Sequence, residues 1–142
     1  MWGPPTWQFL HSLGEVIHPD HYLSVKTNLW KHVVELCRSV PCPDCASHAD
    51  SYLSKIQVPP NKDAFRGVLW TFHNNVNLQT NKPLFPREKL IMYRIPVLFT
   101  FPRCKQAMKK QPYNPLLMIH KMKTGKAVEA MEQWLKKNRL II

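Results

Sequence analysis

Apolar side chains recur at steps of three and four residues in the first part of the chain, and prolines separate the segments that show this spacing. The spacing places the apolar side chains on one face of an α-helix, and a proline ends a helix because it lacks a backbone N–H. No hairpin dipeptide flanked by alternating residues appears. Four helices are therefore predicted, and they cover residues 7–17, 22–40, 42–56 and 61–81.

The chain after residue 86 is less regular, because prolines at 86, 96, 102, 112 and 115 interrupt it. We expect a short fifth helix over residues 87–94 and an extension after it, in which Ile95 to Phe101 is the one segment that could form a short apolar strand. Residues 126–138 can form a further amphipathic helix, whose apolar face should pack on the bundle or on a second subunit rather than on a membrane. That face consists of Val128, Met131, Trp134 and Leu135.

The fold class that these segments predict is all-α. It is a four-helix bundle plus a short fifth helix, followed by a basic C-terminal extension with one further helix. The 142 residues are enough for one domain with a core of its own. No apolar run approaches the roughly 20 residues of a membrane span, and the N-terminus lacks the pattern of a signal peptide, so a cytoplasmic protein is expected.

The net charge of +11 is unevenly distributed. Ten basic and two acidic residues lie from Arg103 onward, so most of the excess belongs to the C-terminal extension. Such a surface could serve only solubility, or it could attract nucleic acid, an acidic protein or a membrane surface. The net charge therefore does not indicate which chemistry the first 95 or so residues perform.

The four cysteines include one close pair, Cys42-Pro43-Asp44-Cys45, at the start of the third predicted helix. A helix N-terminus favours a thiolate, so a reactive dithiol is chemically reasonable here. Three alternatives remain open for this pair: a zinc site, a thioredoxin-like motif, or two inert buried cysteines. The zinc site would use Cys42, Cys45, His48 and a further histidine such as His73, and it would suit a basic module that binds nucleic acid.

The fourth predicted helix carries a polar and aromatic face beside its apolar one. Trp70, His73 and Asn77 follow one another by three and four residues, and Asn74 lies one turn after Trp70. Trp7 and His11 repeat the arrangement on the first helix. Either pair alone could be a core histidine beside a tryptophan. Together with the cysteine pair they favour a site for a planar ligand that forms hydrogen bonds.

These motifs resemble the ERV/ALR family of FAD-linked sulfhydryl oxidases, and most closely its short members from large cytoplasmic DNA viruses. The resemblance covers about residues 2 to 93, which gives an oxidase domain over 1–95 and the basic extension over 96–142. Its motifs are Trp2-Gly3-Pro4-Pro5-Thr6-Trp7-Gln8-Phe9-Leu10-His11, Pro41-Cys42-Pro43-Asp44-Cys45-Ala46-Ser47-His48, and Trp70-Thr71-Phe72-His73-Asn74-Asn75-Val76-Asn77 followed by Lys82-Pro83.

The resemblance implies a noncovalent FAD beside the cysteine pair, and disulfide formation in substrate proteins with O2 as the acceptor and H2O2 as the product. Cys42 would then be attacked by the substrate thiol, and Cys45 would pass two electrons to FAD. The implied partners are substrate protein thiols or a thiol carrier, O2 and a second copy in a homodimer, and neither metal nor nucleic acid is expected. The implied FAD-binding residues are Gly3, Trp7, His11, Arg38, Cys45, His48, Trp70, His73, Asn74, Val76, Asn77 and Lys82.

Several positions depart from the family pattern. Pro4-Pro5 stands where many members have an arginine, and Leu78 and Gln79 replace basic residues, so phosphate neutralisation would rest more on Lys82 and Arg38. No structural disulfide is expected near the fourth helix. Cys104 lies outside the resemblance; it could pair with Cys37 or act as a shuttle, but we expect a free thiol.

Besides the thiol oxidase and the zinc-stabilised module that binds nucleic acid, a third hypothesis is a redox-inactive scaffold whose basic extension recruits partners.

Overall fold

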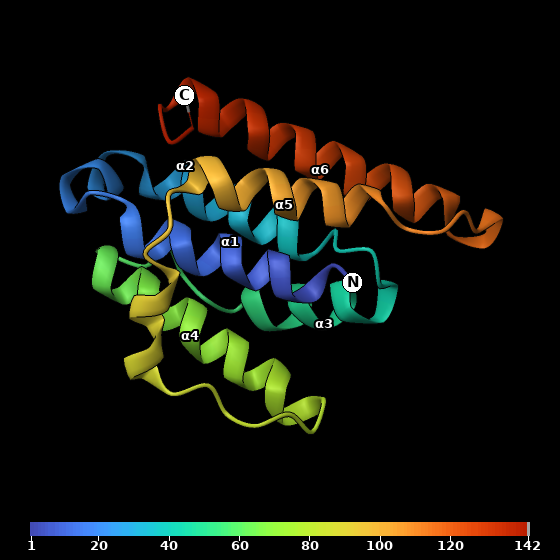
Figure 1. Ribbon diagram of the computed structural model, residues 1–142, viewed down its shortest axis with the longest axis horizontal. Helices are drawn as coiled ribbons and strands as arrows, with labels where there is room; N and C mark the ends of the chain where they lie inside the picture. Colours follow the sequence, from blue (N-terminus) through green and yellow to red (C-terminus); the bar gives the residue numbers. More distant parts are fainter. Residues whose placement is uncertain (142) are drawn as a thin grey trace.

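The computed structural model describes residues 1–141, which form helices joined by short loops (Figure 1). This part of the chain contains no strand, so the prediction of an all-α fold is confirmed and the suggested strand over residues 95–101 is wrong. No helix within it combines the length and the apolar content needed to cross a lipid bilayer. The elements are α1 (Gly3–Val16), α2 (Pro19–Cys37), α3 (Pro43–Leu53), α4 (Lys62–Gln79), η1 (Arg87–Tyr93), α5 (Val97–Lys109), η2 (Pro115–Leu117) and α6 (Met118–Lys137).

The first four helices begin where the sequence supplies a start signal. Prolines occupy the first turns of α1, α2 and α3, where no intrahelical hydrogen bond is lost. The side chain of Asn61 accepts a hydrogen bond from the Ala64 amide and caps α4. The predicted helices agree with these four in number and order, and their limits differ by a few residues.

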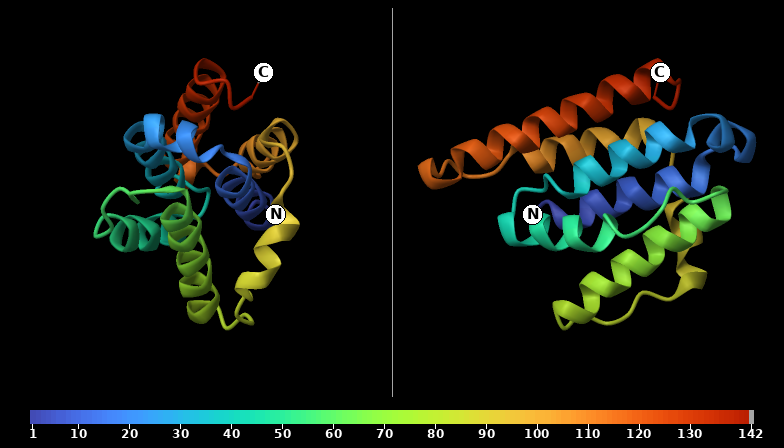
Figure 2. Two further views of the ribbon diagram at one scale, coloured as in Figure 1. Left: turned by 90° about the vertical axis from the view of Figure 1, so that its left-hand side faces the viewer. Right: turned by 180° about the vertical axis from the view of Figure 1, so that it is seen from behind.

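Helix α1 lies at the centre of the fold, between α4 on one side and α5 on the other (Figures 1 and 2). Its apolar side chains Phe9, Leu10 and Leu13 are fully buried, and the α4 side chains Phe65 and Leu69 belong to the same core. Burial of each such side chain stabilises the fold by roughly 1.5–3 kcal/mol. One continuous core therefore holds α1 between helices from both halves of the chain.

Helix α5 is the largest departure from the sequence-based prediction, which expected the prolines at 96 and 102 to prevent a helix. Pro96 is the N-cap of α5 and so precedes the helix, and Pro102 lies inside it with an exposed ring. The side chains of Val97, Phe101 and Cys104 are buried at helical spacing against α1. Phe101 packs on Phe9, and the hydroxyls of Ser12 and Thr100 form a buried hydrogen bond of 2.7 Å. This packing outweighs the cost of the internal proline.

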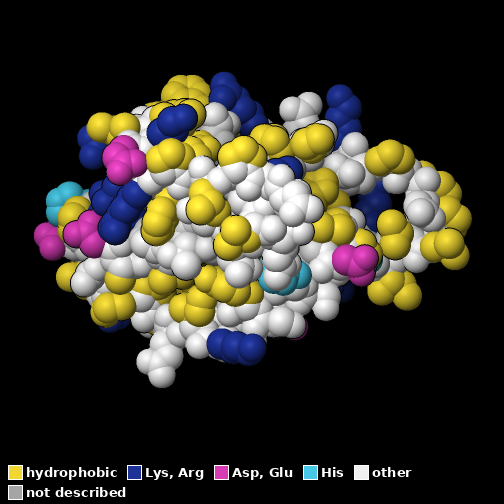
Figure 3. Space-filling model, turned by 90° about the horizontal axis from the view of Figure 1, so that it is seen from below, with side chains coloured by type: hydrophobic (Ala, Val, Ile, Leu, Met, Phe, Trp, Pro, Cys, Tyr) yellow, Lys and Arg dark blue, Asp and Glu magenta, His cyan; other side chains and the backbone are white. Residues whose placement is uncertain are grey.

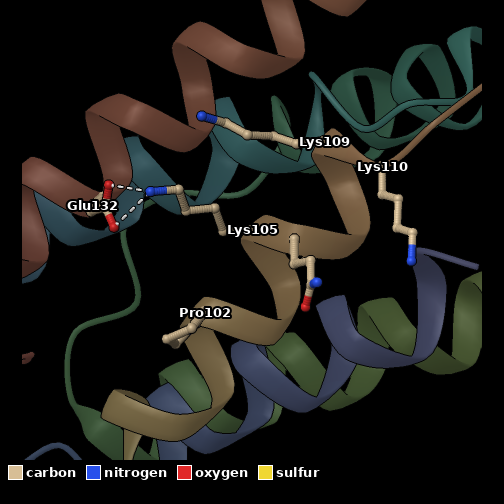
Figure 4. A pocket seen from close by; sticks show the side chains of 6 residues that line it. Pro102, Lys105, Lys109, Lys110 and Glu132 are labelled. Atoms are coloured by element: carbon tan, nitrogen blue, oxygen red, sulfur yellow. Dashed lines mark hydrogen bonds and ion pairs between the residues drawn. The ribbon is translucent and has the colours of Figure 1, made fainter. Parts of the chain in front are cut away.

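Helix α6 is longer than predicted, because it begins at Met118 rather than at residue 126. Its predicted apolar face is confirmed as a packing face, since Val128, Met131, Trp134 and Leu135 are buried. α6 packs against α2 and α5. Lys105 of α5 donates to both carboxylate oxygens of Glu132 of α6, at 2.8 and 3.1 Å (Figure 4). The C-terminal extension is therefore packed on the bundle through apolar and ionic contacts.

A buried carboxylate joins α1, α4 and the segment after η1. The Glu15 side chain is only 2% exposed, and its two oxygens lie 2.7 Å from Arg66 Nε and 3.4 Å from Arg94 Nε. The Lys62 ammonium group also donates to the Glu15 backbone carbonyl, at 2.9 Å. A buried carboxylate is stable only where such partners compensate for its lost hydration.

We expect Glu15→Gln to lower the free energy of unfolding by about 1–3 kcal/mol, because the neutral amide forms weaker hydrogen bonds with the two guanidinium groups. Urea denaturation followed by circular dichroism measures this loss. Glu88→Gln is the matched control, because Glu88 is exposed. An equal effect of the two substitutions would contradict the assigned role of Glu15.

Candidate active site

A disulfide lies at the start of α3. It joins Cys42 to Cys45, whose Cα atoms are 5.2 Å apart. Cys42 is the N-cap residue of α3, and its Sγ accepts a hydrogen bond of 3.2 Å from the Cys45 amide. Cys42 is half-buried and Cys45 is exposed. The positive end of the helix dipole therefore acts directly on these sulfurs and stabilises negative charge on them after reduction.

The face of α3 that carries Cys45 is directed toward α4. His48 and Tyr52 follow Cys45 by three and seven residues, so the three share one side of the helix. His48 Nε2 donates to the Asn75 side-chain oxygen on α4 at 2.9 Å, and the Tyr52 ring stacks on Phe72 with centroids 5.3 Å apart. Asn75 and Tyr52 were not among the site residues predicted from the sequence. His48 is a polar side chain on the face of α3 that packs on α4, so a hydrogen-bond partner such as Asn75 could have been predicted for it.

An aromatic cluster lies between α1 and α4. The Trp7 indole stacks on the His73 ring with centroids 4.1 Å apart and an interplanar angle of 10°. His11 Nε2 and His73 Nδ1 form a buried hydrogen bond of 2.8 Å. Phe85 and Tyr93, from the segment after α4, stack on these histidines. The structure thus brings together the two tryptophan-histidine motifs from α1 and α4, and it adds two rings that no helical periodicity indicated.

Both histidines of the cluster are neutral at physiological pH. Burial lowers the pKa of His11 to about 3, and the repulsion that a protonated His73 would exert acts in the same direction. Burial and the nearby Lys82 ammonium group lower the pKa of His73 to about 4. One ring therefore donates the shared hydrogen bond and the other accepts it, and neither carries charge into the stack.

The polar groups of α4 beside the cluster bond to the chain that follows the helix. Trp70 Nε1 donates to the Phe85 carbonyl at 2.7 Å, and the Asn74 side chain bonds to both the amide and the carbonyl of Phe85. Asn77 Nδ2 donates to the Pro83 carbonyl at 3.1 Å. The predicted polar face of α4 therefore exists, and residues 83–85 lie along it because the turn at Asn81 returns the chain beside the helix.

The other predicted ligand residues are Gly3, Arg38, Val76 and Lys82. Gly3 is the first residue of α1, and no other atom would touch a Cβ placed on it. Val76 is half-buried on α4, and Lys82 is exposed close enough to His73 to lower its pKa. Arg38, at the end of α2, lies between the carboxylates of Glu35 and Asp50, at 3.8 and 3.6 Å. In this structure the Arg38 side chain therefore forms its ion pairs within the chain itself.

The zinc hypothesis does not agree with the structure. Within residues 1–141 no group of three or more histidine, cysteine or acidic side chains converges in an arrangement that could ligate a metal ion. The Cys42 and Cys45 sulfurs are bonded to each other, His48 is bonded to Asn75, and His73 to His11. The thioredoxin-like alternative is also wrong, because that fold needs strands and the described chain has none.

The other two cysteines are free and buried. Cys37 and Cys104 are 2% and 1% exposed, so the prediction of a free thiol at Cys104 is confirmed. Burial raises the pKa of each thiol to about 12. Both therefore stay protonated and inert toward thiol exchange, in contrast to the pair at the start of α3.

The fold is all-helical, and it presents a disulfide at the start of α3 on the side of that helix that faces α4. These features together define the class of helical redox proteins. The model of the Erv1 / Alr family matches residues 4–96. The chain therefore belongs to the Erv1/Alr family, in agreement with the resemblance found in its motifs.

Similar proteins come from viruses and plants. The FAD-linked sulfhydryl oxidase of African swine fever virus (isolate Pig/Kenya/KEN-50/1950) is 32% identical over 84 residues, which are 58% of this chain and 71% of that protein. Protein 347L of Invertebrate iridescent virus 6 is 28% identical over 96 residues, 61% of this chain and 85% of that protein. The FAD-linked sulfhydryl oxidase ERV1 of Arabidopsis thaliana is 30% identical over 89 residues, 62% of this chain and 47% of that protein. No solved structure is significantly similar to the chain.

Proposed function

We propose that this protein is an FAD-linked thiol oxidase that forms disulfide bonds in substrate proteins through its Cys42–Cys45 disulfide. One observation carries the proposal: the disulfide lies at the N-terminus of α3, on the side that faces α4 and its aromatic and amide side chains. Membership in the Erv1/Alr family and the names of the similar proteins support the same activity.

The side chains of the site fit the chemical needs of FAD. The ring systems of FAD need flat aromatic partners, and Trp7, His73 and Trp70 supply them. Its polar edges need donors and acceptors, which Asn74 and Asn77 provide, and the Lys82 ammonium group can neutralise a phosphate. Because residues 83–85 bond to these amides, this segment would exchange its hydrogen bonds for those of the cofactor.

FAD would supply a two-electron acceptor, and the protein's own sulfurs carry out the exchange. A substrate thiolate attacks Cys42 Sγ, a new S–S bond forms, and the Cys42–Cys45 bond breaks with its electron pair on Cys45. The second substrate thiolate then attacks the substrate sulfur of this mixed disulfide. The substrate leaves as a disulfide, and Cys42 becomes a thiolate that the Cys45 amide and the helix dipole stabilise.

The overall reaction balances as oxidation of two thiols to one disulfide with reduction of O2 to H2O2. Cys45 is proposed as the electron donor to FAD, because it shares the side of α3 that His48 and Tyr52 direct at α4. We further propose a homodimer and a cytoplasmic setting, both on the basis of the family resemblance.

Oxygen uptake by the purified protein in the presence of FAD and dithiothreitol tests this function. We expect uptake to require both FAD and the dithiol, and one H2O2 to form for each O2 consumed. Protein that binds FAD but consumes no O2 with the dithiol would contradict the proposal.

A further inference from the structure

The first two turns of α6 and the short η2 before it extend beyond the bundle. In Figures 1 and 2 this part of the chain projects past α5 and α2 at the end of the molecule where α3 begins. Five large apolar side chains are exposed on it: Leu116 (91%), Leu117 (37%), Met118 (39%), Ile119 (84%) and Met122 (57%). We call residues 115–126 the α6 arm. Its apolar side chains contrast with the second half of α6, where the apolar face is buried in the core.

Hydrophobic side chains gather at this projecting end on the surface (Figure 3). A shallow groove beside the arm is lined by Ile119 and Met122, by Lys123 and Lys126, and by Glu35 of α2. A set of neighbouring exposed apolar side chains that the fold itself does not cover is typical of an interaction surface.

The α6 arm is tied to the active-site loop. His120 Nε2 donates to the Val40 carbonyl at 2.6 Å, and Thr124 Oγ1 donates to the Ser39 carbonyl at 2.5 Å. These carbonyls belong to the short loop between α2 and α3, and Val40 lies two residues before Cys42. A polypeptide on the arm would therefore be held beside the disulfide.

The charge of the arm selects the kind of partner. Lys121, Lys123 and Lys126 are exposed, and none of them forms an ion pair within residues 1–141. A second copy would bring the same lysines against each other in a two-fold contact, because ten of the twelve charged residues from Arg103 onward are basic. A membrane surface would gain little from this short segment, because two of its five apolar side chains are only 37% and 39% exposed and a single weak anchor binds lipid only marginally. An acidic and apolar polypeptide satisfies both the lysines and the exposed side chains.

From these observations we infer that the α6 arm is the docking surface for substrate polypeptides whose cysteine pair is flanked by apolar and acidic residues. The inference rests on the proposed oxidase function. It gives the C-terminal extension a role: the arm raises the local concentration of the substrate thiols beside Cys42.

The test compares substrates on the FAD-loaded protein. Two reduced peptides of equal length carry the same pair of cysteines, one flanked by leucine and glutamate and the other by leucine and lysine, and dithiothreitol is the small substrate. We expect kcat/KM for the acidic peptide to exceed that for the basic peptide by about tenfold or more, since a few apolar and ionic contacts suffice for that ratio.

The combined variant Leu116→Ser, Ile119→Ser and Met122→Ser should raise KM for the acidic peptide by about tenfold and leave dithiothreitol oxidation as it is in the parent. Lys121→Glu, Lys123→Glu and Lys126→Glu together should reverse the preference between the peptides. Leu23→Ser is the matched control, because Leu23 is 51% exposed in the first turns of α2, at the far end of that helix from the Cys42 loop.

An unchanged KM for the acidic peptide in the combined serine variant would overturn the inference. Two other results with an unchanged peptide KM would also show the inference to be wrong. Conversion of a dimer into a monomer in sedimentation would make a second copy the occupant of the arm. Loss of binding to vesicles of equimolar phosphatidylserine and phosphatidylcholine would make a membrane the occupant. If the parent failed to oxidise dithiothreitol, the oxidase function itself would be wrong. Fluorescence anisotropy of the labelled acidic peptide would then still decide whether the arm binds it.

Discussion

Cys45→Ser is expected to lower oxidation of dithiothreitol by roughly three orders of magnitude or more, because the sulfur that leaves the disulfide and passes on the electrons is gone. Cys42→Ser should have an equally large effect, because the substrate thiolate then has no disulfide to attack. Oxygen uptake with saturating FAD measures both losses. The serine hydroxyl is close in size to the thiol, and the positions are exposed and half-buried, so the fold should tolerate both changes.

The other two cysteines supply the controls for this experiment. Cys37→Ala and Cys104→Ala remove buried thiols that stay protonated, so we expect them to leave kcat within about twofold while lowering stability by roughly 1 kcal/mol each. A large loss of kcat in Cys104→Ala with intact FAD binding would mean that Cys104 takes part in electron transfer. Residual oxidation in Cys45→Ser at a tenth of the parent rate or more would contradict the assigned relay.

Acid is expected to destabilise the cofactor-free protein sharply between pH 6.5 and pH 4. In the unfolded chain His11 and His73 take up protons near pH 6.5, whereas in the fold their pKa values are lowered to about 3 and about 4. The stabilisation is therefore fully present above pH 6.5 and is lost as the pH falls toward the folded values. Each pH unit in this window costs at most about 1.4 kcal/mol per histidine, so the total reaches several kcal/mol.

Urea denaturation at a series of pH values measures this dependence. The double variant His11→Gln and His73→Gln should show a smaller slope below pH 6.5, even if its stability at pH 8 is lower. His18→Gln and His21→Gln are the matched controls, because His18 is exposed and His21 is only half-buried at the start of α2. Equal slopes in the parent and the double variant would contradict the assignment of acid sensitivity to the cluster.

The bundle could be predicted from the sequence because its signals are local. Prolines and capping residues mark where α1, α2, α3 and α4 begin, and the apolar steps give the buried face of each. The sequence also indicated that Trp7 and His11 of α1 and His73 of α4 belong to one site, although it did not predict their direct contacts. The spacing and the helix start made a reactive Cys42–Cys45 pair reasonable, and the family resemblance was needed to choose a redox disulfide over the alternatives.

The features that escaped prediction depend on tertiary contacts. α5 contains Pro102 and forms because Phe101 and Thr100 pack on α1. These tertiary contacts cannot be predicted from helix propensities, which depend on local sequence alone. Phe85 reaches the cluster because the loop after α4 turns back along the helix, so its contacts lie outside any helical period. The first turns of α6 were missed because their exposed side chains at Ile119 and Met122 show no buried face.

The central claim is that electrons pass from a dithiol through Cys42 and Cys45 to FAD, and anaerobic titration of the FAD-loaded protein with dithiothreitol tests it most directly. We expect the flavin absorption band near ~450 nm to disappear with about one equivalent of dithiol beyond that needed to reduce the disulfide, and to return when air is admitted. In Cys45→Ser the band should persist on the same time scale. A protein that binds no FAD, or a band that bleaches equally fast in Cys45→Ser, would contradict the account.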